Sequence, residues 1–225
     1  MKKFKICTIL SIYAFGVLLL LSPRMGYADT MTLKLESVGG QSSGFVQGEY
    51  VYPYNFSFNG STDLTPLMCI SYENTIYFGE SWTATMVPVS GNEQYVEAAY
   101  ILAQATVPGA STNTIAVAQW ANWELFDPGD SNLTNNLPSG YQPQIDTLLA
   151  QASAFAVNNV NTTDFPNIDI FIPVAGTQPS GDDYPQMFVG DPDPPGDAPE
   201  PGSFILFGSG LLGLAGLIFR KRCIA

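Results

Sequence analysis

The charged residues of this chain are separated by sign along its length, and that separation limits what each part can fold into. Of the eight Lys and Arg residues, seven lie near the two ends and only Lys34 lies between them. All 20 Asp and Glu residues fall within residues 29–200. The chain therefore has two apolar, basic ends and one strongly acidic middle, which is long enough to bury a single core.

The acidic middle and the absence of one residue type exclude several classes of function. A surface this negative repels nucleic acid and anionic lipid, so we expect no nucleic-acid partner. The chain contains no His, which is the commonest metal ligand and the usual general base. We therefore expect no metal site, no cofactor and no Ser-His-Asp catalysis.

Residues 1–28 have the layout of a secretory signal peptide. Basic residues come first, an apolar run from Ile6 to Leu21 follows, and the small residues Gly26 and Ala28 precede Asp29. This order predicts export and cleavage by signal peptidase before Asp29. The alternative is a permanent N-terminal anchor.

The other end of the chain predicts a membrane helix. Gly202 to Phe219 is an uncharged stretch that would form a helix of roughly 27 Å, just enough for a bilayer core. Arg220, Lys221 and Arg222 follow at once. Basic residues at the end of a span stay in the cytoplasm, so the acidic part would lie outside the inner membrane, anchored by one helix.

Three features in this order resemble a known sorting signal. Pro199, Glu200 and Pro201 precede the apolar stretch, and Arg220 to Arg222 end it. The pattern resembles the PEP-CTERM sorting signal, which implies processing by a membrane-embedded exosortase and an end point at the cell surface or in the extracellular matrix. The alternative is an ordinary single-pass anchor.

Between the two ends, the sequence predicts one domain and a spacer. Residues 29–189 form the domain, 190–201 a Pro/Asp-rich linker ending in Pro-Glu-Pro, and 202–225 the membrane helix with its basic tail. Within the domain, residues 31–36, 44–52, 54–58, 67–72, 168–173 and 186–189 read as strands. Helical spacing predicts helices over 93–106, 112–126 and 142–157. The fold class expected is α+β, with an antiparallel sheet or barrel and a helical insert.

One cysteine and one helix carry the candidate chemistry. Cys7 and Cys223 lie in the terminal segments, so processing leaves Cys69 as a lone thiol on an expected strand. Fifty residues later, Gln119, Ala121 and Trp123 lie on an expected helix. Together these residues resemble the thioester domains of bacterial surface adhesins. The resemblance implies Cys69 as thiol, Gln119 as acyl donor, Ala121 as a small residue and Trp123 as a packing aromatic.

These observations lead to one expected function and two alternatives. We expect an exported adhesive protein, not an enzyme, that attaches to extracellular polysaccharide or to a surface amine. The first alternative is an inert acidic matrix protein in which Cys69 is a small core residue and Gln119 lies on a helix surface. The second is a secreted hydrolase that uses two of Glu73, Glu97 and Glu124.

Overall fold

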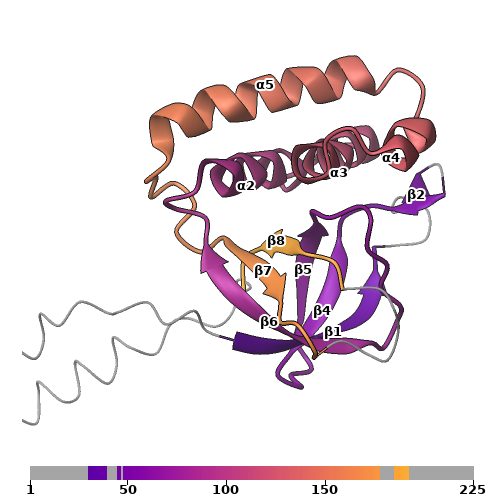
Figure 1. Ribbon diagram of the computed structural model, residues 1–225, viewed down its shortest axis with the longest axis vertical. Helices are drawn as coiled ribbons and strands as arrows, with labels where there is room; N and C mark the ends of the chain where they lie inside the picture. The colour runs from indigo at the N-terminus through magenta and orange to yellow at the C-terminus, as the bar shows by residue number, and fades with distance from the viewer. Residues whose placement is uncertain (1–29, 40–44, 47, 178–184, 193–225) are drawn as a thin grey trace, which may run out of the picture.

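The computed structural model describes residues 30–39, 45–46, 48–177 and 185–192. The expected signal peptide, the membrane helix and most of the linker lie outside these residues. Figure 1 shows a barrel of strands with helices stacked on one side of it, and α5 is the helix farthest from the barrel. Within the described ranges, no helix is both long and apolar enough to cross a membrane.

The strands close into an antiparallel barrel in the order β1-β4-β5-β8-β7-β6. Their bounds are β1 Thr30–Val38, β4 Tyr54–Phe58, β5 Leu64–Cys69, β6 Ser81–Pro88, β7 Asp169–Pro173 and β8 Phe188–Gly190. A separate two-stranded hairpin pairs β2 (Phe45–Val46) with β3 (Glu49–Tyr50). The expectation of an α+β fold with an antiparallel barrel is confirmed for the described residues.

Alternation along the strands fills the barrel interior. In β1, Leu33 and Leu35 are buried while Lys34 between them is exposed, as expected for a strand with one face on the core. Phe56 of β4 meets Phe188 of β8 and Trp82 of β6, with ring centroids 4.7 and 5.7 Å apart and edge-to-face geometry. Strands from across the barrel thus share one aromatic core.

Two glycines meet backbone requirements of the barrel. The turn between β4 and β5 has φ of 50° at Asn59 and 78° at Gly60, a left-handed pair that these residue types tolerate. In β8, a Cβ on Gly190 would collide with a methyl group of Leu67 on β5. A larger residue at this position would force the Leu67 side chain to shift where the two strands approach closely.

The helical insert lies between β6 and β7 in the sequence. It contains α2 (Glu93–Ala105), α3 (Thr112–Phe126), the short α4 (Ser131–Asn136) and α5 (Gln142–Asn159). Asn92 caps α2 by accepting a hydrogen bond from the Tyr95 backbone N–H, and Ser111 caps α3 in the same way through Thr114. The three expected helices are therefore present, nearly at the expected bounds.

Helix α3 is enclosed by its neighbours. It packs against β5 of the barrel and against α2 and α5 (Figure 1). Eight successive residues, from Ala116 to Trp123, are buried. A helix with polar groups inside such a run must satisfy them with protein partners, and this requirement applies directly to Gln119.

Four local expectations differ from the structure. Strand β6 and helix α4 were not expected, and the strand expected over 44–52 is instead the short β2–β3 hairpin. The strand expected over 67–72 ends at Cys69, because Ser71 and Tyr72 turn away to begin the loop that leads to β6. Cys69 is consequently the last residue of β5.

Candidate functional site

Cys69 and Gln119 meet where β5 ends against α3. Both residues are fully buried. The Gln119 Nε2 atom donates a hydrogen bond to the Cys69 carbonyl oxygen at 2.5 Å, and its Oε1 atom accepts one from the Tyr52 backbone N–H at 3.2 Å. These partners fix the orientation of the amide, since a backbone carbonyl can only accept and a backbone N–H can only donate. The placement of Gln119 on a helix surface, one of the alternatives, is therefore wrong.

Trp123 reaches the same cysteine from the next helical turn. Residues four apart on a helix lie on one face, and the Trp123 indole Nε1–H contacts the Cys69 sulfur at 3.4 Å. The Cys69 thiol donates to the Ser71 carbonyl oxygen at 3.2 Å. The backbone oxygen and the sulfur of Cys69 are thus both engaged by one face of α3.

The surroundings keep the Cys69 thiol neutral. Burial raises its pKa to about 12, and the contacts with Trp123 and Ser71 oppose that rise only in part. A thiol in such a site carries its proton at neutral pH and is shielded from solvent. Within the part of the chain that the structure describes, Cys69 is a free thiol with no disulfide.

The remaining residues of this helical face are also buried. Ala121, the expected small residue, is fully enclosed. Asn122 donates from Nδ2 to the Met68 sulfur at 2.9 Å, while its Oδ1 atom and the Trp120 Nε1 atom have no hydrogen-bond partner among the described residues. Gln119, in contrast, has both ends of its amide satisfied, which identifies it as the anchored polar group of α3.

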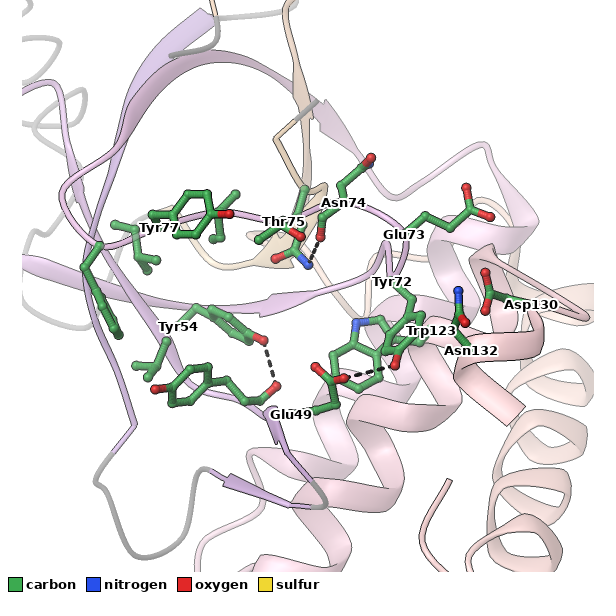
Figure 2. Close-up of a pocket in the computed structure, with 16 residues that line it drawn as sticks. Glu49, Tyr54, Tyr72, Glu73, Asn74, Thr75, Tyr77, Trp123, Asp130 and Asn132 are labelled. Atoms are coloured by element: carbon green, nitrogen blue, oxygen red, sulfur yellow. Dashed lines mark hydrogen bonds between the residues drawn. The ribbon is translucent and has the colours of Figure 1, made fainter. Parts of the chain in front are cut away.

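A groove of about 590 Å³ opens on the other side of Trp123. Figure 2 shows Tyr54 and Tyr77 on one side of it and Glu73, Asp130 and Asn132 on the other, with Glu49, Tyr72 and Trp123 between. Tyr72 packs edge-on against Trp123, with ring centroids 5.1 Å apart. Trp123 therefore separates the buried Cys69 sulfur from a site that solvent can enter.

Tyr72 is the centre of a hydrogen-bond network at the groove floor. Its hydroxyl donates to Glu49 Oε1 at 3.0 Å and accepts from Asn136 Nδ2 at 2.9 Å. Its backbone N–H donates to Asp127 Oδ2 at 2.5 Å, which ties the loop after β5 to the end of α3. Partial burial raises the pKa of the Tyr72 phenol, and the Glu49 carboxylate adds to that rise.

The three glutamates of the hydrolase alternative do not share a site. Glu73 lines the groove. Glu97 lies on α2, where burial raises its pKa while a hydrogen bond from Ser153 of α5 partly opposes the rise. Glu124 lies on α3 and accepts from Gln142 of α5 at 3.1 and 3.2 Å.

The groove is the part of the site that sequence reasoning missed. Its lining comes from β1, β3, β4, the loop after β5, α3, α4 and the segment before β8. The loop from Tyr72 to Phe78 did hold a signal, because it combines three aromatic residues with an acid and an amide between two strands. In the described ranges, no cluster of acidic or sulfur side chains is arranged to hold a metal ion.

The six sorting-signal residues lie outside the described part of the chain, but they fall within a known sequence motif. Residues 197–222 match the PEP-CTERM protein-sorting motif. That range includes Pro199, Glu200 and Pro201 at one end and Arg220, Lys221 and Arg222 at the other.

Comparison of the rest of the chain gives no family. No curated protein and no solved structure matches it, so the resemblance of the central domain to thioester domains has no support from known relatives. What the comparisons do show is the sorting motif, which indicates an exported protein that is targeted to an exosortase through a C-terminal membrane-anchored signal.

Proposed function

We propose that this chain is a non-enzymatic adhesive protein of the cell surface or extracellular matrix, and that its barrel domain attaches through an internal thioester between Cys69 and Gln119. The sorting motif supports the delivery of the domain to the outside of the cell. The proposal about attachment depends on the contact between β5 and α3.

The observation that carries the proposal is the double engagement of Cys69 by one helical face. The carboxamide of Gln119 reaches the backbone of Cys69 at 2.5 Å, and Trp123 reaches its sulfur at 3.4 Å. Both side chains are fully buried, so the carboxamide and the thiol lie in one enclosed region where water does not compete. A core cysteine does not need a buried amide beside it, since cysteine packs as a small apolar residue.

The thioester bond forms by acyl substitution at the Gln119 carboxamide carbon. The Cys69 sulfur adds to this carbon, the C–N bond breaks, and the thiol proton leaves with the nitrogen as ammonia. The products are one thioester and one ammonia, with no oxidant or reductant. Because burial raises the pKa of Cys69 to about 12, the thiol holds its proton at rest, and this proton passes to the leaving nitrogen as the sulfur adds to the carbon.

The resulting thioester would be shielded from water until a target displaces the side chains that cover it. An amine or hydroxyl that attacks the acyl carbon releases Cys69 as a thiol and leaves Gln119 joined to the target through an amide or ester. Trp123 and Tyr72, in edge-on contact at 5.1 Å, stand between the groove and the sulfur. The groove is therefore the side from which a target would approach.

A second function is favoured by one specific observation. Both ends of the Gln119 amide are satisfied by backbone atoms of Cys69 and Tyr52, so the residue already has a structural role in joining β5 and the segment before β4 to α3. In this case the domain is an inert acidic component of the matrix, and Cys69 remains a thiol.

Mass and thiol chemistry separate the two functions. We expect the mature protein, which has lost Cys7 with its signal peptide and Cys223 with its sorting tail, to be one ammonia lighter than its processed sequence. It should resist thiol labelling when unfolded without amine, and gain one reactive thiol at Cys69 after treatment with methylamine. Cys69→Ala should restore the lost ammonia. A full-mass wild-type chain with a free Cys69 in the unfolded state would establish the inert alternative.

The matched control is a glutamine in a different environment. Gln142 of α5 bonds to Glu124 and Asp146 at the surface and does not approach Cys69. Gln142→Ala should keep the loss of ammonia, whereas Gln119→Ala should abolish it and leave a labelled thiol from the start. If both variants keep the mass deficit, a different pair of residues carries the bond.

A further inference from the structure

The groove beside Trp123 combines two kinds of surface that a single ligand would have to match. Its volume of about 590 Å³ falls within the range of small-molecule sites, roughly 300–1,000 Å³. Tyr54 and Tyr77 lie on one side and Glu73 and Asp130 on the other (Figure 2). An aromatic half therefore faces an acidic half across one opening.

The aromatic half contains exposed rings beside the buried Tyr54, in a domain that buries most of its large aromatic side chains. Tyr77 and Phe78 are 63% and 57% exposed, whereas Trp120 and Phe56 are fully buried. Phe78 is held edge-on against Tyr50, which is 43% exposed, with centroids 6.1 Å apart. Exposed aromatic rings gathered at a cavity mark a binding surface, because they offer flat apolar faces at low entropic cost.

The acidic half selects the charge of the ligand. Among the residues that the structure describes, Glu49, Glu73 and Asp130 line the groove, and no Lys or Arg does. In the portion that the structure describes, the one basic side chain is Lys34, which pairs with Glu36 at 2.9 Å on the barrel surface. Uronate, sulfate and phosphate groups would be repelled here, whereas an ammonium group would be attracted.

We propose that the groove binds a glycan that carries free amino groups. The apolar face of a pyranose ring packs on Tyr77 and its aromatic neighbours, and the ammonium substituent lies toward Glu73 and Asp130. Asn74, Thr75 and Asn132, which also line the groove, supply hydrogen bonds to sugar hydroxyls. A lysine side chain carries the same charge but has no ring face to cover the aromatic half.

This inference rests on the proposed function in one respect only: a glycan bound in the groove would be held on the groove side of Trp123, from which a target would approach the thioester. The binding itself needs no covalent bond. We therefore test it in the full chain carrying Cys69→Ala, which cannot form a thioester. Failure of binding and failure of the thioester then give separate results.

The experiment is calorimetric titration with four probes. We expect a β-1,4-linked glucosamine oligosaccharide to bind at least tenfold more tightly than its N-acetylated counterpart, than pentalysine and than oligogalacturonate. Raising the salt concentration should weaken binding, because part of it is charge attraction. Equal affinity for the acetylated oligosaccharide or for pentalysine, or no binding of glucosamine oligosaccharide, would overturn the proposal.

Variants at the groove have matched controls elsewhere on the surface. Tyr77→Ala and Glu73→Gln should each weaken binding of the glucosamine oligosaccharide at least fivefold, since both side chains are exposed and line the groove. Val107→Ala and Glu93→Gln alter an exposed apolar and an exposed acidic side chain outside the groove. Those controls should leave the affinity unchanged, and a loss as large as at the groove would contradict the assignment.

Discussion

The two sides of Trp123 differ in how the chain has satisfied its polar groups. On the inner side, Gln119 and Cys69 are fully buried and their polar contacts are with each other, with Trp123 and with backbone atoms. On the outer side, the side chains of Glu73 and Tyr77 face solvent. The inner side is a fixed contact between Gln119, Cys69 and Trp123, and the outer side is a surface available to a ligand.

This difference predicts which substitutions should change stability and which should change binding. Removing a buried group costs both its packing and the hydrogen bonds of the partners it leaves behind. Removing an exposed group costs little stability, because water replaces the lost contacts. Substitutions on the inner side should therefore change the free energy of unfolding, and those on the outer side should change affinity.

The largest effect is expected at Trp123, which separates the Cys69 sulfur from the groove. Trp123→Ala should lower the free energy of unfolding by about 3–5 kcal/mol, because it leaves a large cavity in the core. Cys69, once it is a thiol, should also become accessible to labelling reagents in the folded state. Urea unfolding and the rate of thiol labelling measure the two effects.

Trp123→Phe is the control for this change. It keeps an aromatic ring but removes the indole N–H that contacts the Cys69 sulfur at 3.4 Å. It should cost clearly less stability than Trp123→Ala and leave the thiol slow to label. Equal losses of stability for both variants would mean that the N–H contact, rather than the bulk of the ring, holds this part of the core together.

The second effect is the dependence of stability on alkaline pH. In Gln119→Leu, which cannot form the thioester, Cys69 is a free thiol. Burial raises its pKa from 9.0 to about 12, so the folded state holds a proton that the unfolded state loses. Stability should be full below pH 9.0 and fall as the pH rises toward 12, by up to about 4 kcal/mol.

Comparison with a second variant isolates this titration. The double variant Cys69→Ala/Gln119→Leu has the same other titratable groups but lacks the Cys69 thiol. The difference between the two unfolding free energies should decline over this pH range. A constant difference would show that Cys69 is not held as a buried neutral thiol.

The third effect tests whether Gln119 is anchored as its contacts indicate. Gln119→Leu, measured at pH 7 in the background of Cys69→Ala, leaves the Tyr52 N–H and the Cys69-position carbonyl without side-chain partners. The expected loss is about 2–3 kcal/mol, from two buried unpaired groups. Gln142→Leu, at the half-exposed surface of α5, should cost less than about 0.5 kcal/mol.

The inner side was partly predictable from sequence, and the outer side was not. Cys69, Gln119 and Trp123 could be proposed because a lone thiol and the i, i+4 spacing on one helix are visible in a single sequence. Their spatial contact depends on α3 lying against β5, which sequence spacing does not determine. The groove has a local signature only in the loop from Tyr72 to Phe78, because the rest of its lining is collected from strands and helices far apart in the chain.

The fold shows the same division between local and non-local information. Helices α2 and α3 were predictable from apolar spacing and from the caps Asn92 and Ser111. Strand β6 was overlooked although Trp82 and Ala84 alternate with exposed or half-buried residues, because small and polar side chains weaken its apolar pattern. Barrel closure pairs β1 with β6 and β5 with β8, and such long-range register is set by packing of the whole core.

The smallest expected effect lies where the two sides join. Tyr72→Phe keeps the ring against Trp123 but removes the hydroxyl that bonds Glu49 at 3.0 Å and Asn136 at 2.9 Å. Because this hydroxyl is only partly buried, the loss should be about 0.5–1.5 kcal/mol, the usual contribution of one hydrogen bond. Tyr77→Phe, at an exposed ring of the same loop, should be within about 0.5 kcal/mol of the wild type.

A double-mutant cycle with Glu49→Gln measures how much of the Tyr72 effect comes from the hydrogen bond between Tyr72 and Glu49. If Tyr72→Phe costs as much as Gln119→Leu, the network at the groove floor belongs to the rigid core, and the boundary between the two sides lies beyond Tyr72 instead of at Trp123.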